Sequence, residues 1–261
     1  MKMKRILAAA LSGALLLTLA ACQQPSQTNT GSPAPSPQTV TFTRDNFPRL
    51  DGSTSTAPLG RAIASVLLGE SEDDVADLIH FSRTSESFRQ LMQGNSDLLI
   101  VAEPSPNVLD ELDAAGFEIQ MEPFANDGLV FVVNADNPVD SLTVEQLRDI
   151  YTGKITNWKE VGGDDLEIAP FQRNAESGSQ VLMEKLVMDG QAMMEPPEGY
   201  MLSEMGTLME AVRSYDNSAS AIGYSVFYYA SDMEMASGLK ILRVDGVNPS
   251  ADAIRSGEYP L

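Results

Sequence analysis

Arg173 and the residues after it form the stretch of this chain best suited to chemistry. Residues 173–187 read RNAESGSQVLMEKLV, with Ser177 where a helix N-cap is expected and apolar residues at helical spacing behind it. A helix N-terminus offers unpaired N–H groups, and Gly178 lets a ligand approach the backbone closely. The Arg173 guanidinium can bind phosphate or carboxylate in bidentate fashion. We therefore expect Arg173, Ser177, Gly178 and Ser179 to bind an oxyanion; the alternative is a capped helix beside a surface arginine.

Two other hydroxyl-rich turns stand between a predicted strand and a predicted helix. The first holds Ser53, Thr54 and Ser55, and the second holds Thr84 and Ser85. Ligands of open α/β sheets bind beyond the carboxyl ends of the strands, where such turns lie. One turn of this kind is explained by the N-cap preference of Ser and Thr. Three of them around one point would surround an anion with O–H and N–H donors.

The charge of the chain limits its partners. The 261 residues carry a formal net charge of −20, which argues against nucleic acid and against a polybasic membrane surface. An anion site in this field must be built locally, from backbone N–H groups, hydroxyls and one or two arginines.

The N-terminus predicts export and a lipid anchor. Three basic residues precede a short apolar run at residues 6–19, and the sequence Leu-Ala-Ala-Cys ends at Cys22. This resembles a bacterial lipobox, so we expect a signal peptide at residues 1–21 and a lipidated Cys22; a membrane-spanning helix with a chance cysteine is the alternative. Residues 22–39, rich in Pro, Ser, Thr and Gln, read as a flexible tether.

The sequence gives little support for a catalytic site or a metal site. Cys22 is the only cysteine and His80 the only histidine, and His80 lies in a predicted apolar strand at residues 78–81. We expect His80 to be a core residue; a Ser-His-Asp triad through it is the enzymatic alternative. Several methionines between residues 183 and 209 could bind Cu(I), although helical methionines more often fill a core. We expect no enzyme, no cofactor and no metal.

Strands alternate with helices along residues 40–261. Predicted strands include residues 97–102, 117–121, 129–134, 168–171, 221–224 and 239–244, and predicted helices include residues 108–115, 144–151 and 203–213. The alternation predicts an α/β protein with mostly parallel sheets flanked by helices.

Five segments in order resemble the phosphate-binding lipoproteins of bacterial phosphate ABC transporters. They are GSTSTAPL at residues 52–59, DIYTGKITNWKEVGG at 149–163, RNAESGS at 173–179, AIGYSVFYYA at 221–230 and VDGVNPSADAIRSGEYPL at 244–261. The resemblance implies a two-lobe fold of the periplasmic-binding-protein type, with a ligand cleft between lobes that closes by a hinge. Lobe one would comprise residues 40–125 and 238–261, and lobe two residues 126–237.

The resemblance also implies ligand and partners. The chain would be an extracytoplasmic, membrane-anchored monomer that captures inorganic phosphate and delivers it to permease subunits. Thr54, Ser55 and Thr84 would bind the anion from lobe one, and Arg173 and residues 177–179 from lobe two. Ala102 and Glu103 stand where the family has an acid or a Ser-Arg pair, so we expect Glu103, or else Glu176, to accept the phosphate hydroxyl. Alternatives are another small anion, or a sensor or adhesion lipoprotein on the same fold.

Overall fold

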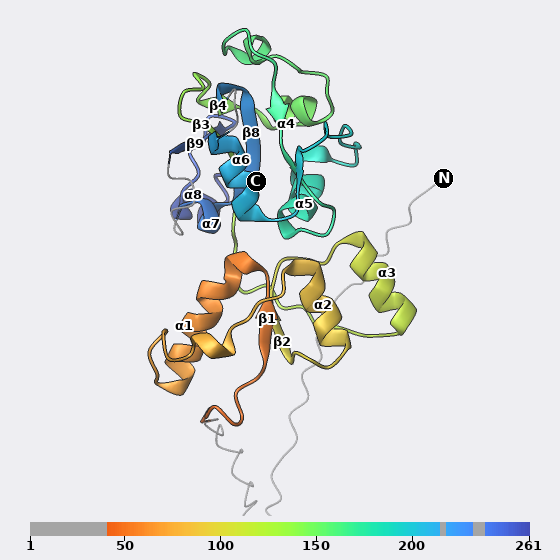
Figure 1. Ribbon diagram of the computed structural model, residues 1–261, viewed down its shortest axis with the longest axis vertical. Coiled ribbons are helices and arrows are strands. Elements are labelled where there is room, and N and C mark those ends of the chain that lie inside the picture. Colours follow the sequence, from red (N-terminus) through yellow and green to blue (C-terminus); the bar gives the residue numbers. More distant parts are fainter. Residues whose placement is uncertain (1–40, 215–217, 232–237) are drawn as a thin grey trace, which may run out of the picture. The chain divides into compact units, whose positions relative to one another are not determined.

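The computed structural model describes residues 41–214, 218–231 and 238–261, and Figure 1 shows their elements. Cys22, the predicted signal peptide and the predicted tether lie outside the described residues. Within the described part, no helix is long and apolar enough to cross a membrane.

The first lobe, residues 41–125, has a two-stranded parallel sheet. Strands β1 (Leu50–Gly52) and β2 (Leu98–Ile100) pair side by side. Helices α1 (Ala57–Leu68), α2 (Thr84–Met92) and α3 (Pro106–Ala115) surround them, with short helices η1 (Thr54–Thr56) and η2 (Ala76–Leu78). One apolar cluster is centred on Leu50, Ala64, Val75, Ile79 and Ile100, and another on Phe88, Val108 and Leu112. The hydroxyl-rich turns thus follow directly from a buried strand or lead directly into a helix.

The second lobe, the described residues from 126 onwards, is organised on strand β3 (Leu129–Asn134), all of whose residues are buried. Its sheet has the order β5-β8-β3-β9, with β5 (Ala169–Pro170), β8 (Ala221–Val226) and β9 (Leu239–Ile241). The β3–β8 and β3–β9 pairings are antiparallel and the β5–β8 pairing is parallel. The expectation of a mostly parallel sheet in this lobe is therefore corrected to a mixed sheet.

The remaining elements of the second lobe are short. Two further parallel pairs join β4 (Ser141–Leu142) to β10 (Arg243–Val244) and β6 (Gln172–Arg173) to β7 (Met201–Leu202). The helices are α4 (Val144–Tyr151), η3 (Trp158–Val161), α5 (Gly178–Met183), the π-helix η4 (Glu184–Met188), α6 (Met205–Ser214), η5 (Ser218–Ser220), α7 (Phe227–Ser231) and α8 (Ala251–Ser256). Local signals explain some of these boundaries: α4 begins with a capping box in which Thr143 and Gln146 satisfy each other's backbone N–H.

The last residues of the chain pack with the second lobe. Strand β9 pairs with β3, with Lys240 opposite Val133. The Tyr259 hydroxyl donates to the Leu129 carbonyl at 2.9 Å, and Leu261 belongs to the same buried cluster as β3. The expected return of residues 238–261 to the first lobe is therefore wrong, because their partners are β3 and β4.

Two predicted strands do not form. Residues 79–83 and 117–128 have no regular secondary structure. His80 is exposed, so the expectation of a core histidine in an apolar strand is wrong; the flanking Ile79 is buried. Ile79 and Phe81 belong to one apolar cluster of the first lobe and Phe117 and Ile119 to the other, whereas Met121 and Phe124 are exposed.

Candidate anion site

Arg173, on β6, is a buried arginine held by neutral partners. Only 7% of it is exposed. Its Nε donates to the Leu202 carbonyl at 3.1 Å and its Nη2 to the Ser203 carbonyl at 3.1 Å, while Nη1 lies 3.4 Å from the Ser179 hydroxyl. Nη1 also lies 3.3 Å from the sulfur of Met205, one of the methionines that could have suggested a metal site.

No carboxylate lies within ion-pair distance of Arg173 among the described residues. Burial lowers the pKa of the Arg173 guanidinium below its ordinary value; the nearby charge of Arg83 acts in the same direction, and Glu204 opposes it. A buried charge without a counter-ion is costly, so such an arrangement suits a site that an anion occupies.

Tyr224 fixes the backbone of Arg173. The Arg173 N–H donates to the Tyr224 hydroxyl at 2.9 Å, and that hydroxyl donates to the side-chain oxygen of Gln180 on α5. The Tyr224 ring makes an edge contact with Tyr151, with centroids 5.5 Å apart, and burial raises the pKa of the Tyr224 phenol. The two ends of the residue 173–180 loop are thus tied to one strand, β8.

The turn before α5 has the predicted cap. Ser177 accepts a hydrogen bond from the Gln180 N–H at 3.3 Å, and Ser179 is buried. The Gly178 N–H donates to the hydroxyl of Thr84 at 3.2 Å. The second and third hydroxyl-rich turns therefore meet at this hydrogen bond.

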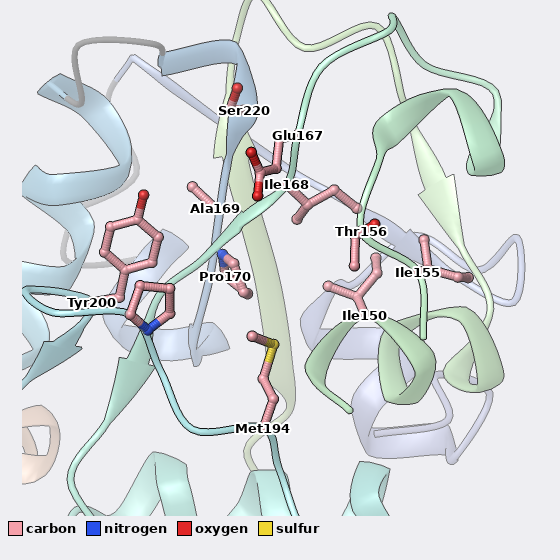
Figure 2. A pocket seen from close by; sticks show the side chains of 11 residues that line it. Ile150, Ile155, Thr156, Glu167, Ile168, Ala169, Pro170, Met194, Tyr200 and Ser220 are labelled. Atoms are coloured by element: carbon pink, nitrogen blue, oxygen red, sulfur yellow. The ribbon is translucent and has the colours of Figure 1, made fainter. Parts of the chain in front are cut away.

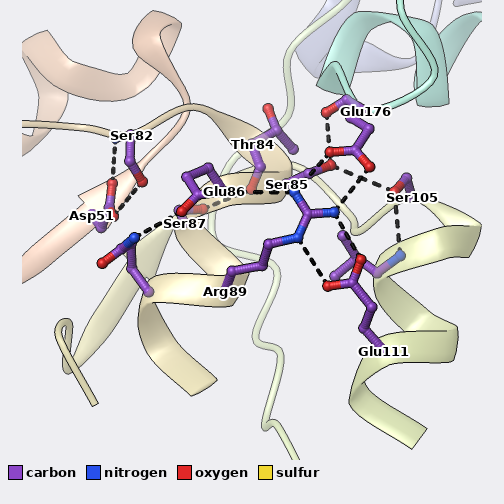
Figure 3. Close-up of polar contacts among 12 residues, drawn as sticks. Asp51, Ser82, Thr84, Ser85, Glu86, Ser87, Arg89, Ser105, Glu111 and Glu176 are labelled. Carbon is purple, nitrogen blue, oxygen red and sulfur yellow. Dashed lines mark hydrogen bonds and ion pairs between the residues drawn. The ribbon is translucent and has the colours of Figure 1, made fainter. Parts of the chain in front are cut away.

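Ser85 and Glu176 make a further contact between these two turns (Figure 3). The Ser85 hydroxyl donates to the Glu176 carbonyl at 2.7 Å. The Glu176 carboxylate accepts from both terminal nitrogens of Arg89 at 2.8 and 2.9 Å, and Arg89 also binds Glu111. Hydrogen bonds from Arg89 lower the pKa of Glu176 and of Glu111. Glu176, the reserve candidate for the phosphate hydroxyl, is thus committed to Arg89.

The first turn lies beside the second. The Arg83 N–H donates to the Gly52 carbonyl at 3.1 Å, which connects the end of β1 to the second turn. Ser53 is buried, and its hydroxyl lies 3.1 Å from that of Ser55. Thr54 is exposed. No hydrogen bond connects Ser53, Thr54 or Ser55 to the third turn in the described part of the chain.

Glu103 is bound to a lysine of the second lobe. Its side chain is 53% exposed, and both its oxygens accept from the Lys185 ammonium, at 2.8 and 2.7 Å. Its neighbour Ala102 instead faces Gly178: a Cβ on that glycine would lie 3.4 Å from the Ala102 Cβ. Because its carboxylate is bound to Lys185, Glu103 gives no support to its expected role at the anion.

Arg83 was not among the residues expected at the anion site, although it stands next to two of them, Thr84 and Ser85. It precedes α2, is exposed, and has φ 83° and ψ 164°, a conformation that residues with a side chain rarely adopt. Its Nη1 lies 3.9 Å from the carboxylate of Glu204. The sequence Ser-Arg-Thr-Ser gives no sign of this backbone conformation, although its arginine, next to two predicted anion ligands, could have drawn attention.

A separate cavity of about 330 Å³ lies in the second lobe (Figure 2). It contains none of the predicted site residues, and most of the residues that line it are apolar: Ile150, Ile155, Thr156, Glu167, Ile168, Ala169, Pro170, Met194, Pro197, Tyr200 and Ser220.

Four of the methionines that could have suggested a metal site are buried in the core of the second lobe: Met183, Met188, Met205 and Met209. Among the described residues, no three His, Cys, Asp or Glu side chains are placed to hold a metal ion.

Comparison with known proteins identifies the superfamily of the chain. A family model described as a PBP superfamily domain matches residues 31–261. The phosphate-binding protein PstS of Bacillus subtilis is 31% identical over 220 residues, covering 81% of this chain and 66% of that protein. PstS of Borreliella burgdorferi is 30% identical over 143 residues, covering 53% of this chain and 50% of the relative. The chain thus spans between half and about two thirds of the length of these relatives.

Solved structures share the two-lobe fold. One from Clostridium perfringens, described as a phosphate ABC transporter substrate-binding protein with bound phosphate, has a TM-score of 0.61 and 26% identity, covering 81% of each chain. An ABC-type phosphate transport receptor from Vibrio cholerae has a TM-score of 0.51 at 24% identity, covering 81% of this chain and 82% of the receptor, and bears on the fold alone.

Proposed function

We propose that this chain, which belongs to the PBP superfamily, captures inorganic phosphate outside the cytoplasm and delivers it to the permease subunits of an ABC transporter. The ligand and the transporter are inferred from the relatives named above. The local geometry around Arg173 supports an anion as the ligand.

The observation that carries the proposal is the state of Arg173. Its guanidinium is buried, holds no carboxylate among the described residues, and lies beside the Ser179 hydroxyl. Its Nε and Nη2 are already bound to backbone carbonyls, and these two hydrogen bonds fix the plane of the guanidinium group. Nη1, which has the long contacts of 3.4 Å to Ser179 and 3.3 Å to Met205, is the nitrogen best placed to turn to an anion.

The remaining donors lie on both sides of the same point. The Gly178 N–H and the Thr84 hydroxyl bond to each other. When an anion enters, each can exchange that bond for an anion oxygen, and a charge-assisted hydrogen bond is stronger than a neutral one. Ser177 caps α5 and so holds the Gly178 and Ser179 N–H groups in place. Ser53, Thr54, Ser55 and Ser85 then act as supports of the turns or as outer ligands.

The proposal includes the anchor and the mode of action. Lipidated Cys22 would hold the protein on the extracytoplasmic face of the cell membrane as a monomer, and the tether would give the lobes reach to the permease. Ligand capture requires no covalent step, and neither Arg173 nor Thr84 has a histidine or cysteine partner in the described residues. The protein would act by binding and release.

Sulfate is the second candidate. A site selects phosphate when a carboxylate accepts the hydroxyl that phosphate has and sulfate lacks. Glu103 is bound to Lys185 and Glu176 to Arg89, which favours an anion that needs no acceptor.

Calorimetry of the purified full-length protein against phosphate and against sulfate tests the proposal. We expect phosphate to bind with a micromolar or lower Kd, and Cys22→Ala to release the protein from membranes without changing that Kd. Absence of phosphate binding at millimolar concentration contradicts phosphate capture, and binding of sulfate alone supports the second candidate.

A further inference from the structure

Arg83 occupies a backbone conformation that glycine adopts freely and other residues adopt under strain. Its φ of 83° and ψ of 164° place its Cβ against neighbouring backbone atoms. A chain under no other constraint would be more stable with glycine at this position. The arginine side chain must therefore contribute something that offsets the strain, and residues of this kind gather at ligand-binding turns.

Hydrogen bonds on both sides of Arg83 hold it in this conformation. The Asp51 carboxylate accepts from the N–H of Ser82 at 2.7 Å and from its hydroxyl at 2.6 Å (Figure 3). The Arg83 N–H donates to the Gly52 carbonyl at 3.1 Å, and the Arg83 carbonyl accepts from the Ser87 N–H at 2.9 Å. The end of β1 and the first turn of α2 thus fix the direction in which the arginine side chain leaves the backbone.

The Arg83 side chain reaches the surroundings of Arg173. Its Nη1 lies 3.9 Å from Glu204 Oε1, and the two side chains are 59% and 66% exposed. Ser203, the residue before Glu204, accepts from Arg173 Nη2 at 3.1 Å. Burial lowers the pKa of the Arg173 guanidinium most; the charge of Glu204 opposes this and that of Arg83 adds to it. An ion pair this long and this exposed is weak, so the Arg83 guanidinium can leave Glu204 for another anion at small cost.

We propose, resting on the proposed function, that Arg83 is a second anion-binding arginine, which exchanges Glu204 for the ligand and makes the site prefer a dianion. With Arg83, Arg173 and Glu204 the site carries a charge of +1, against a chain charge of −20. Removing Arg83 leaves a charge of 0. The loss falls most heavily on the doubly charged form of phosphate, because the interaction energy scales with the product of the charges.

Two substitutions separate the strain of Arg83 from its charge. Arg83→Gly removes both, so the ligand-free protein should melt about 2–6 °C higher while binding phosphate about tenfold less tightly. Arg83→Gln keeps the strain and removes the charge, so it should lose affinity to a similar degree without a rise in Tm. Arg255→Gln is the matched control, since Arg255 lies on α8, is 79% exposed and pairs with Asp252; neither quantity should change.

The preference for the dianion gives a readout that a structural role would not move. In wild type, phosphate affinity should rise with pH through the range in which the monoanion becomes the dianion, and in Arg83→Gln the rise should be smaller. Glu204→Gln removes the competing carboxylate and should tighten binding about threefold. The measurement is calorimetric titration with inorganic phosphate.

The outcomes are distinct for the two proposals. If wild type binds no phosphate, the proposed function fails and this inference with it. If wild type binds phosphate and Arg83→Gln matches it in affinity and pH dependence, the role of Arg83 alone is overturned. A higher Tm of Arg83→Gly with an unchanged affinity for phosphate also overturns the role of Arg83.

Discussion

The Gly178 N–H and the Thr84 hydroxyl, 94 residues apart in the sequence, meet at 3.2 Å. The contact is close: a Cβ on Gly178 would lie 3.0 Å from the Thr84 oxygen and 3.4 Å from the Ala102 Cβ. A side chain at position 178 would therefore press against Thr84 and Ala102 where the second and third turns touch.

Gly178→Val should separate these turns. A valine would overlap Thr84 and Ala102, so we expect phosphate affinity to fall about tenfold or more and Tm to fall by a few degrees. Gly178→Ala should have a smaller effect of the same sign. The exposed neighbour Ala175 provides the control, because Ala175→Val should leave both calorimetric Kd and Tm as they are. Equal affinity in Gly178→Val and wild type would place the ligand elsewhere.

Arg173→Ala should abolish most of the affinity. Removing one member of a desolvated charge-assisted contact costs about 2–5 kcal/mol, which corresponds to a Kd at least about 30-fold higher. Arg173→Lys should recover only part of the loss, because an ammonium cannot reproduce the planar fork held by the Leu202 and Ser203 carbonyls. Calorimetry against phosphate, with Arg255→Ala as control, provides the measurement; an effect below about threefold would move the site away from Arg173.

Tyr224→Phe should destabilise the protein and loosen the site. The Arg173 N–H would lose its acceptor and Gln180 its donor, and a buried unsatisfied group costs about 1–3 kcal/mol. The midpoint of urea unfolding should fall accordingly. Tyr228→Phe is the control, because the Tyr228 side chain is 38% exposed. If the two variants unfold alike, the Tyr224 hydroxyl contributes nothing measurable.

Local sequence signals predicted the parts of the site that depend on local structure. Ser177 caps a helix and Arg173 precedes it because spacing and cap chemistry act within a few residues. Side-chain directions and strand partners that depend on distant segments could not be predicted from such local signals. His80 is exposed, and β9 joins β3 instead of the first lobe.

The direction of the Glu103 side chain and the backbone strain at Arg83 could not be predicted from the sequence either. Glu103 and Ala102 differ by one position, and only the register of the chain after β2 decides which of them faces Gly178. The conformation of Arg83 depends on Asp51 and Ser87, which lie on different elements.

Glu103→Gln should leave anion selectivity unchanged. The carboxylate is half exposed and bound to Lys185, so replacing it removes a surface ion pair and nothing at the turns. The ratio of phosphate to sulfate affinities, measured by competition calorimetry, should match that of wild type. A changed ratio would show that Glu103 leaves Lys185 and reaches the ligand.

Arg89→Gln should weaken the protein at neutral pH and not in acid. Arg89 lowers the pKa of Glu176 and Glu111, so their folded values lie below the unfolded value of about 4.3. The stabilisation is thus present above that pH and disappears as pH falls through the folded values. The urea midpoint of the variant should lie below that of wild type at pH 7, and the gap should narrow as pH falls below the unfolded value of about 4.3. A gap that persists at low pH would mean that Arg89 acts through packing.

Strand β3 sets the order in which the molecule can fold. β1 finds its partner β2 at residues 98–100, early in the chain, whereas β3 at residues 129–134 waits for β8 at 221–226 and β9 at 239–241. Pairing over such separations closes long loops and is slow. The second lobe, including strand β8 that fixes Arg173, is therefore expected to form after the first, and β3, apolar from Leu129 to Val133, must stay unpaired until residues 221–241 are available.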